Sequence, residues 1–417
     1  MLPAPRRFRS FAQRSRDIVL PAAVVGVVTG LLVAGIESLT VEALLEPIED
    51  LPLGVLAFMP LVGLVLAAVI LRYPGRRSSP ALTDEWLQAF HDPERDMDWR
   101  RAPAVILASI TTIGFGGALG LEGPSLYTGG AVGTAVQERL RRFFAPIDAK
   151  MLMTAGAAAG VAAIFKAPAT GALFALEVPF QDDFARRKLL PALVAAATGY
   201  LGFALVHGTG TLFPVAGEPA LDATNLTGAV LLGTAAGLAA RGFSWMIRTA
   251  KRLQATPLVP RVLAAGLVLA GLFALGRVLT GRNLMLGPGY DCIDWALSPS
   301  RSIGVVLAIL ILRTFATAVT TAGGGAGGLF IPLVVSGALL GRAVGGVLDA
   351  LDNTLFLVVG VSAFLGAGYR VPLAAVMFVA ETTGRAGYVV PALLAAVVAE
   401  LVMGRDCVTT YQRPRTS

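Results

Sequence analysis

Long apolar segments follow one another along almost the whole chain, from Ile18 to Met403. Several of them reach about 20 residues, the length that an α-helix needs to cross the hydrocarbon core of a bilayer. Of the 417 residues 55% are hydrophobic and 15% are charged, whereas a soluble domain carries about 25% charged residues. The pattern therefore predicts an all-α protein that crosses the membrane many times.

Many of these segments do not have the length of one clean crossing. The apolar stretches at 152–177 and 354–380 are longer, and each is predicted to contain two helices. The chain also contains 48 Gly and 25 Pro, which disfavour helix interiors in water. A bilayer tolerates interrupted helices only where protein or a water-filled cavity satisfies the freed backbone groups. Broken helices are therefore expected, and they are typical of transporters.

The net charge of +7 could suggest nucleic-acid binding, but the basic residues fall in short connections between apolar segments. The clusters are Arg6 to Arg9, Arg76-Arg77, Arg100-Arg101, Arg139 to Arg142, Arg186 to Lys188 and Arg248 to Arg252. A positive-inside bias explains most of them, so no nucleic-acid partner is expected. We predict a cytoplasmic N-terminus at 1–17, a transmembrane domain at 18–403 and a cytoplasmic C-terminus at 404–417.

Two segments share a basic residue, a Pro, a Phe and a Glu at the same spacing. The first is Lys166-Ala-Pro-Ala-Thr-Gly-Ala-Leu-Phe-Ala-Leu-Glu177 and the second is Arg370-Val-Pro-Leu-Ala-Ala-Val-Met-Phe-Val-Ala-Glu381. A Gly-rich stretch that ends in Pro precedes each, at 116–124 and at 323–332. This self-similarity predicts two homologous halves, at about 20–207 and 222–403.

Repeats in transporters are commonly inverted, which brings half-helix ends from both halves to the midplane of the membrane. Here each Gly-rich break leads to a Pro, which suits the first turn of a helix because its missing N–H would be unpaired there. The other N–H groups of such a turn, with the positive end of the helix dipole, favour an anion. The predicted substrate is therefore negatively charged.

Glu122 lies inside the first of these breaks, in Gly120-Leu121-Glu122-Gly123-Pro124. Carboxylates at membrane depth are costly and mark ion or proton pathways. If Glu122 lies where an anion binds, its carboxylate can occupy the site and leave it when protonated. The alternative is a structural carboxylate that caps a helix N-terminus.

Other motifs have competing interpretations. Gly327-Gly328-Leu329-Phe330-Ile331-Pro332 could present N–H groups to an anion or could serve close helix packing. Ser78-Ser79-Pro80-Ala81 has the local pattern of an N-cap Ser followed by Pro at the first helical position.

The two repeat segments contain matching charged residues. Glu177 and Glu381 are equivalent, and we interpret both as structural acceptors of hydrogen bonds from interrupted helices. Lys166 and Arg370 are also equivalent, and they could raise the local potential for anions or extend towards the membrane surface.

Metal and catalytic chemistry have little support in the sequence. Cys292 and Cys407 are far apart, so neither a disulfide framework nor a metal site is predicted. His91 and His207 have no ligand residue at metal spacing, and no role is assigned to them. An intramembrane hydrolase would need a metal-binding pair or an activated nucleophile. We therefore expect no enzyme activity and no cofactor.

Taken in order, these motifs resemble those of the CLC family of chloride channels and chloride/proton antiporters. Gly-Leu-Glu-Gly-Pro at 120–124 is similar to the family's GREGP, and Gly-Gly-Leu-Phe-Ile-Pro at 327–332 is similar to its GxFxP. The resemblance covers about residues 20–410. It implies an inverted repeat of tilted, partly broken helices and a homodimer with one pore per subunit, in a bacterial plasma membrane with both termini cytoplasmic.

The resemblance also implies roles for residues of the site. Glu122 corresponds to the external gating glutamate, and the N–H groups of Leu121 and Gly123 would line the external anion site. The N–H groups of Leu329 and Phe330 would bind an anion at the central site.

Two side chains of the central site match the family less directly. Ser79 stands where the family has the Ser of GSGIP. The Tyr of the central site would fall near residues 408–409, and the nearest Tyr is Tyr411.

Val178 follows Glu177, at the position of the proton-transfer glutamate of typical antiporters. The resemblance thus implies transport of chloride or a similar small monovalent anion, gated by Glu122, in a channel-like or weakly proton-coupled mode. Strictly coupled chloride/proton antiport and fluoride/proton antiport are the alternatives.

Overall fold

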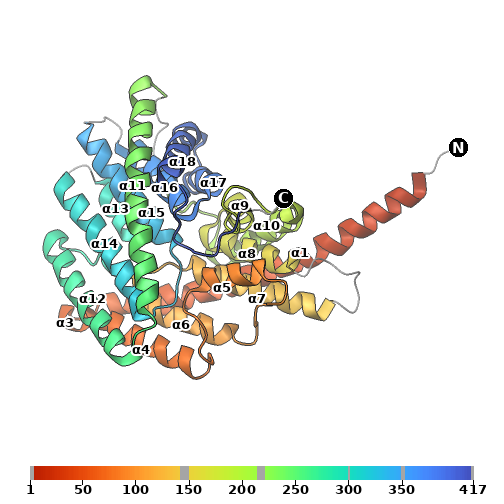
Figure 1. Ribbon diagram of the computed structural model, residues 1–417, viewed down its shortest axis with the longest axis horizontal. Coiled ribbons are helices and arrows are strands. Elements are labelled where there is room, and N and C mark those ends of the chain that lie inside the picture. Colours follow the sequence, from red (N-terminus) through yellow and green to blue (C-terminus); the bar gives the residue numbers. More distant parts are fainter. Residues whose placement is uncertain (1–3, 141–149, 214–220, 299–300, 349–352, 415–417) are drawn as a thin grey trace.

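The computed structural model describes residues 4–140, 150–213, 221–298, 301–348 and 353–414, and these residues fold almost entirely into helices (Figure 1). Residues 1–3 and 415–417 of the predicted cytoplasmic termini lie outside this description, as do Arg141 and Arg142. The only extended pairings in the described part are isolated bridges. The all-α prediction is confirmed.

The chain up to residue 207 forms a first series of helices. These are α1 (Ala4–Thr40), a π-helical turn (Val41–Leu45), α2 (Glu46–Glu49), α3 (Leu53–Leu56), α4 (Met59–Arg72), α5 (Leu82–His91), α6 (Ala102–Gly114), α7 (Glu122–Leu140), α8 (Met151–Phe165), α9 (Pro168–Glu177), a 3₁₀ turn (Arg186–Lys188) and α10 (Leu189–His207).

A second series follows from residue 223. It comprises α11 (Ala223–Leu253), α12 (Leu258–Thr280), α13 (Tyr290–Leu297), α14 (Ile303–Gly323), α15 (Phe330–Val347), α16 (Asn353–Tyr369), α17 (Pro372–Thr383), a 3₁₀ turn (Ala386–Tyr388) and α18 (Val389–Met403).

Among the described residues, eight helical segments are long and apolar enough to cross a membrane by length and composition. Their outer faces carry large apolar side chains such as Leu201, Leu267 and Leu401, which are 57%, 60% and 77% exposed. Such faces are stable against lipid rather than water. The chain is therefore a multi-pass membrane protein.

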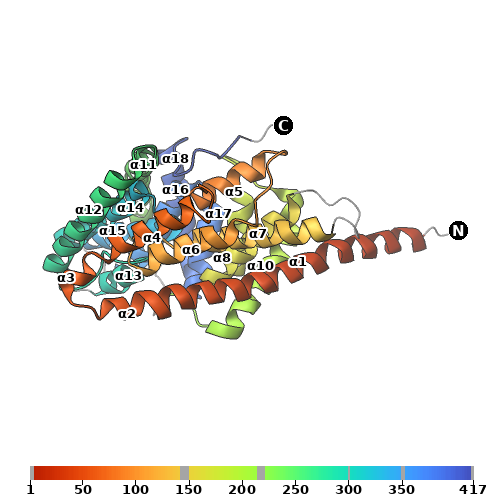
Figure 2. The same cartoon turned by 90° about the horizontal axis from the view of Figure 1, so that it is seen from below.

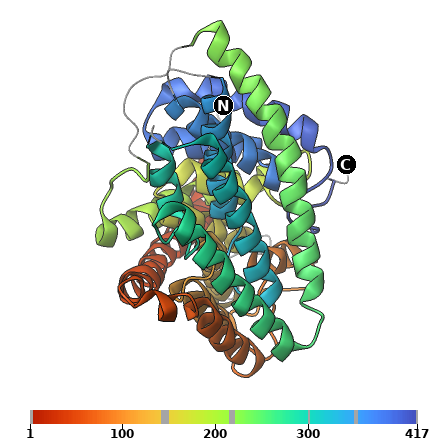
Figure 3. The same cartoon turned by 90° about the vertical axis from the view of Figure 1, so that its left-hand side faces the viewer.

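The helices of the two series pack in the same order. In the first, α1 packs against α8 and α10, α4 packs against α6, and α7 packs against α8. In the second, α11 packs against α16 and α18, α12 packs against α14, and α15 packs against α16. The long helices α1 and α11 each extend along an outer face (Figures 2 and 3). This packing supports the predicted halves, whose boundaries at 20–207 and 222–403 stay a prediction.

Both long apolar stretches contain two helices, as predicted. The first divides into α8 and α9, and the second divides into α16 and α17. Each break is a basic residue with left-handed backbone, Lys166 at φ 53° and Arg370 at φ 57°. Pro168 and Pro372 then begin the next helix, where a missing N–H costs least.

The two repeat segments are joined by reciprocal hydrogen bonds. The carboxylate of Glu177 accepts bonds of 3.2 and 3.0 Å from two backbone N–H groups in the first turn of α17. Glu381 accepts bonds of 2.9 and 2.7 Å from two N–H groups in the first turn of α9. The structural interpretation of the two glutamates is confirmed. Each repeat segment therefore supplies the acceptor for the first turn of the helix in the other.

Candidate anion site and the cavity beside it

The two Gly-rich breaks meet in the centre of the molecule. Gly120 N donates to Gly328 O at 2.9 Å, and Gly328 N donates to Gly120 O at 2.8 Å. Two threonine hydroxyls accept hydrogen bonds from further N–H groups across the same junction. Ala326 N in the second break donates to Thr112 Oγ1 at 3.1 Å, and Ala118 N in the first break donates to Thr320 Oγ1 at 3.2 Å. These bonds place the N-termini of α7 and α15 side by side.

Glu122 is the first residue of α7 and is 2% exposed. Its Oε1 atom accepts a 2.5 Å hydrogen bond from the backbone N–H of Phe330, the first residue of α15. The Oε2 atom is buried and has no hydrogen-bond partner among the described residues. The carboxylate therefore occupies the N-terminus of a helix from the other half, a position that favours negative charge.

Glycines leave the space that this carboxylate fills. A Cβ atom at Gly120 or at Gly328 would overlap the Glu122 carboxylate. Because only Gly lacks a Cβ, both glycines are needed for the observed position of the side chain. Gly328 also serves close packing, the alternative role considered for this motif, because its backbone lies against the backbone of Gly123.

Phe330 is held by an aromatic cluster. Its ring centroid lies 4.4 Å from that of Phe165, 5.3 Å from that of Phe174 and 5.0 Å from that of Phe378. Phe174 and Phe378 are the equivalent Phe residues of the two repeat segments. The repeat segments thus pack their Phe rings against the start of α15.

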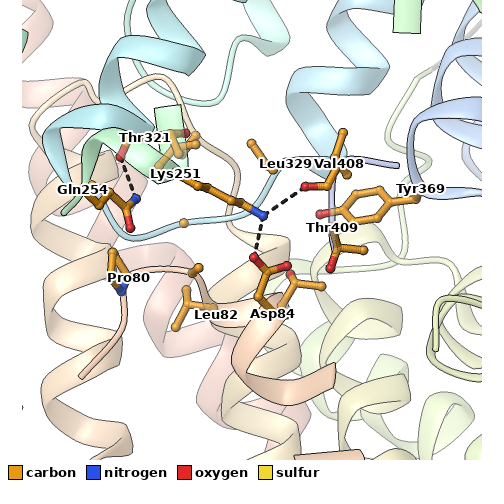
Figure 4. Close-up of a pocket in the computed structure, with 15 residues that line it drawn as sticks. Pro80, Leu82, Asp84, Lys251, Gln254, Thr321, Leu329, Tyr369, Val408 and Thr409 are labelled. Carbon is orange, nitrogen blue, oxygen red and sulfur yellow. Dashed lines mark hydrogen bonds and ion pairs between the residues drawn. The ribbon is translucent and has the colours of Figure 1, made fainter. Parts of the chain in front are cut away.

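A cavity lies beside Leu329, the residue that precedes Phe330. The N-terminus of α5 and the C-terminus of α11 border it (Figure 4). The lining comprises Pro80, Ala81, Leu82, Thr83, Asp84, Leu119, Lys251, Gln254, Thr321, Gly325, Gly327, Leu329, Tyr369, Val408 and Thr409. Figure 4 shows Lys251 reaching across it, with Nζ 2.5 Å from Asp84 Oδ2 and 3.0 Å from Val408 O.

The backbone positions predicted from the Gly-rich motifs come together around Glu122 and the cavity. Leu329 lines the cavity, and the N–H of Phe330 is bound by Glu122. Leu121 is 2% exposed and precedes α7, and Gly123 lies against the backbone at Gly328.

Ser79 and Tyr411 are not among the residues that line the cavity. Ser79 is exposed, and its Oγ accepts a 3.1 Å bond from Ala81 N. It is not an N-cap, because α5 begins at Leu82 and Ala81 is the N-cap residue. Tyr411 is 38% exposed.

Tyr369 supplies the aromatic side chain of the cavity instead. It is 2% exposed and comes from the end of α16, whereas the expected positions 408 and 409 contribute Val and Thr. A sequence signal existed, since an aromatic residue precedes the basic residue in both repeat segments, Phe165 before Lys166 and Tyr369 before Arg370.

Lys251 and Asp84 were also missed. Lys251 belongs to the basic cluster interpreted as a connection beside the membrane, but it lies in the last turn of α11 and points into the cavity. Asp84 lies in the first turn of α5, a short helix outside the predicted apolar stretches.

Lys166 bonds to a backbone carbonyl group, and Arg370 bonds to a backbone carbonyl group and a carboxylate. Lys166 Nζ donates to His207 O at 2.9 Å, and Arg370 donates to Gln181 O at 3.1 Å and to Asp182 at 2.6 Å. Neither lines the cavity. Their observed partners lie at the end of α10 and in the segment after α9.

The described residues contain one group whose ligand atoms could hold a metal ion, formed by Glu37, Glu42 and His207. His207 Nε2 lies 3.0 Å from Glu37 Oε2 and 3.2 Å from Ala34 O. The His207 ring is therefore within hydrogen-bonding distance of a carboxylate and a backbone carbonyl group. His91 contacts Pro179 O at 2.7 Å.

Helix N-termini that meet at a buried carboxylate, within a multi-pass helical membrane protein, form a candidate anion site. The chain belongs to the CLC family: the family described as "Voltage gated chloride channel" matches residues 62–404. Anion transport is the function that this membership supports.

Curated relatives extend along most of the chain. The H(+)/Cl(-) exchange transporter ClcA of Citrobacter koseri is 28% identical and is matched over 94% of this chain and 87% of its own length. ClcA of Salmonella arizonae is 27% identical, over 95% of this chain and 88% of its own.

Solved structures share the fold. A CLC-type fluoride/proton antiporter superposes with a TM-score of 0.82 at 23% identity, over 95% of this chain and 98% of the other. A slow cyanobacterial Cl⁻/H⁺ antiporter superposes with a TM-score of 0.79 at 20% identity, over 93% and 94%. The predicted CLC-type fold is confirmed.

Proposed function

We propose that the protein moves chloride or a similar small monovalent anion across the membrane and that Glu122 is the gate. The observation that carries this proposal is the bond from the N–H of Phe330 to the carboxylate of Glu122. A carboxylate and a free anion compete for the same donor at a helix N-terminus. Protonation removes the negative charge of Glu122, so it favours the anion in this competition.

Proton coupling of this transport has support from the relatives, which are named as exchange transporters and antiporters. A channel-like or weakly coupled mode is the second candidate, and one residue favours it. Val178 is fully buried beside Glu177 and has no group that can carry a proton. In a coupled mode, Glu122 would exchange its proton by another route, such as water.

Liposome flux separates the two modes. Purified protein is reconstituted, a chloride gradient is imposed, and the external pH is followed with an electrode. Coupled exchange moves protons uphill at the expense of the chloride gradient, whereas a channel moves chloride without them. Competition between chloride and fluoride in the same assay distinguishes the two anions.

Glu122→Gln tests the gate because Gln has the same shape but does not ionise. We expect its anion flux to lose the pH dependence of the wild type. Glu138→Gln is the matched control, since Glu138 is exposed and accepts a bond from Trp99. An unchanged pH dependence in Glu122→Gln would reject the gating role.

We further propose a homodimer in the plasma membrane with both termini in the cytoplasm. Exposed apolar side chains on α10 and α18, including Leu193 and Val397 at 43% and 44%, offer a surface for a second subunit or for lipid. Light scattering of the protein–detergent particle measures the assembly, and a single-chain mass would contradict the dimer.

A further inference from the structure

The cavity contains a charged pair to which the proposed gate gives no role. Asp84 and Lys251 are the acidic and the basic side chain among the described residues that line it. Their side chains are 8% and 19% exposed, and the atoms Nζ and Oδ2 are 2.5 Å apart. Water screens a pair so enclosed much less than an ion pair on the surface.

Each partner lies at the end of a helix whose dipole favours its charge. Asp84 lies in the first turn of α5, where the dipole favours an anion, and Lys251 lies in the last turn of α11, where it favours a cation. The N-cap residue of α5, Ala81, gives no side-chain bond to the turn that follows. The surroundings of Asp84 are therefore suited to a negative charge, whichever group supplies it.

An ammonium group enclosed in protein is costly without a negative partner. Asp84 is that partner in the structure, and a free anion in the same place would meet the same requirement. The lining also includes Thr83, Tyr369 and Thr409, whose side chains have hydroxyl groups of the kind that can donate to an anion. Leu329, at the other side of this lining, directly precedes the Phe330 N–H that Glu122 occupies.

We propose that Lys251 binds the transported anion in this cavity and that Asp84 is its exchangeable counter-ion. Glu122 and Asp84 then have parallel roles, because each is a tethered carboxylate in a place that an anion takes during transport. This inference rests on the proposed function, since it assigns a second binding step to the same pathway.

A purely structural pair is the competing explanation. Lys251 also bonds Val408 O at 3.0 Å, so the pair could simply hold the C-terminal segment against α5 and α11. Arg248 and Asp406 provide a matched control because they form a 2.8 Å pair from the same helix to the same segment. Neither of these two residues lines the cavity.

The experiment compares Asp84→Asn, Lys251→Met, Lys251→Arg and the double Asp84→Asn/Lys251→Met variant with the controls Arg248→Met and Asp406→Asn. Chloride binding to the purified protein is measured by calorimetry, with fluoride in parallel, and chloride flux is measured in liposomes. The thermal midpoint of each variant reports folding.

Asp84→Asn removes the competitor and leaves the cation, so we expect chloride to bind about tenfold more tightly. Lys251→Met should bind chloride about tenfold or more weakly than the wild type, and the double variant should bind it about tenfold or more weakly than Asp84→Asn. Lys251→Arg should retain most of the chloride affinity of the wild type. Arg248→Met and Asp406→Asn should leave the chloride affinity of the wild type unchanged.

Unchanged chloride and fluoride affinity in a folded Asp84→Asn variant would overturn the inference, even if Lys251→Met fails to fold. Equal effects in the control pair would also overturn it. The proposed function fails separately, if wild-type liposomes move neither anion. The binding measurements test Lys251 in that case too, because they do not depend on flux.

Discussion

The position of the Glu122 side chain depends on two glycines, Gly120 and Gly328, whose missing side chains leave room for its carboxylate. The Glu122 carboxylate reaches the first N–H of α15 through space that Gly120 and Gly328 leave open. The two glycines differ in what else lies nearby. Around Gly120 the obstructing atoms belong to the flexible carboxylate, whereas at Gly328 the backbone N of Gly123 is also only 2.5 Å from an added Cβ.

Alanine at these two positions should therefore have different effects. Gly120→Ala should push the Glu122 carboxylate from α15 and weaken the pH dependence of anion flux, with little change in the thermal midpoint. Gly328→Ala should displace the same carboxylate but also destabilise the fold by about 1–3 kcal/mol, because backbone must move. Liposome flux against pH and thermal unfolding measure both. Equal stability losses would contradict this distinction.

At this scale the sequence indicates candidate residues where a local motif marks each one, and the structure brings two of them, Glu122 and Phe330, into contact. Glu122 and Phe330 stand in Gly-rich breaks whose chemistry is local. Lys251 and Asp84 are 167 positions apart, and nothing in either segment indicates the other. Lys251 lies at the end of a helix among other basic residues, a pattern that equally fits a membrane-flanking connection.

At the scale of elements, the first turn of each of the short helices α9 and α17 donates hydrogen bonds to a carboxylate near the end of the other helix. The first N–H groups of a helix have no partner within it. Glu177 and Glu381 supply acceptors to these groups from the opposite segment. Thr170 Oγ1 adds a 2.7 Å bond to Glu381, so the two exchanges are similar but not identical.

Replacing either carboxylate should weaken the junction between the repeat segments. Glu177→Gln and Glu381→Gln keep one acceptor oxygen and lose the charge, so we expect each to reduce stability by about 1–3 kcal/mol. The loss should be greater for Glu381, which accepts the additional hydroxyl bond. Thermal unfolding in detergent measures the change, with the exposed Glu94→Gln as the control. A control-like midpoint for both variants would refute the capping role.

The apolar pattern predicts the elements best where it is long and ends at Pro or Gly. It identified the division of 152–177 and 354–380 because both stretches are too long for one crossing, and Pro168 and Pro372 mark where the second helix of each begins. It missed α5, whose ten residues include Asp84, Glu85 and His91 and whose apolar face is short. Ser79 and Tyr411 were taken from the family resemblance, and neither lines the cavity.

At the scale of the whole molecule, equivalent elements have equivalent ends. Helices α10 and α18 both terminate at a Gly with φ +68°, Gly208 and Gly404. Each Gly donates its N–H to the carbonyl four residues earlier, in Ala204 and Glu400. If the halves are inverted in the membrane, these matching ends lie on opposite sides of it. The connections after them are then exposed to different compartments.

Labelling with a membrane-impermeant maleimide tests that arrangement. Gly210 and Arg405 are exposed residues just beyond the two ends, whereas the native Cys292 and Cys407 are 0% and 5% exposed. The wild type should therefore react little. We expect Gly210→Cys to react in intact cells and Arg405→Cys to react only after the membrane is permeabilised, because the C-terminus is proposed to be cytoplasmic. Reaction of both from one side would contradict the inverted repeat, and labelling of the denatured variants confirms that both thiols are present.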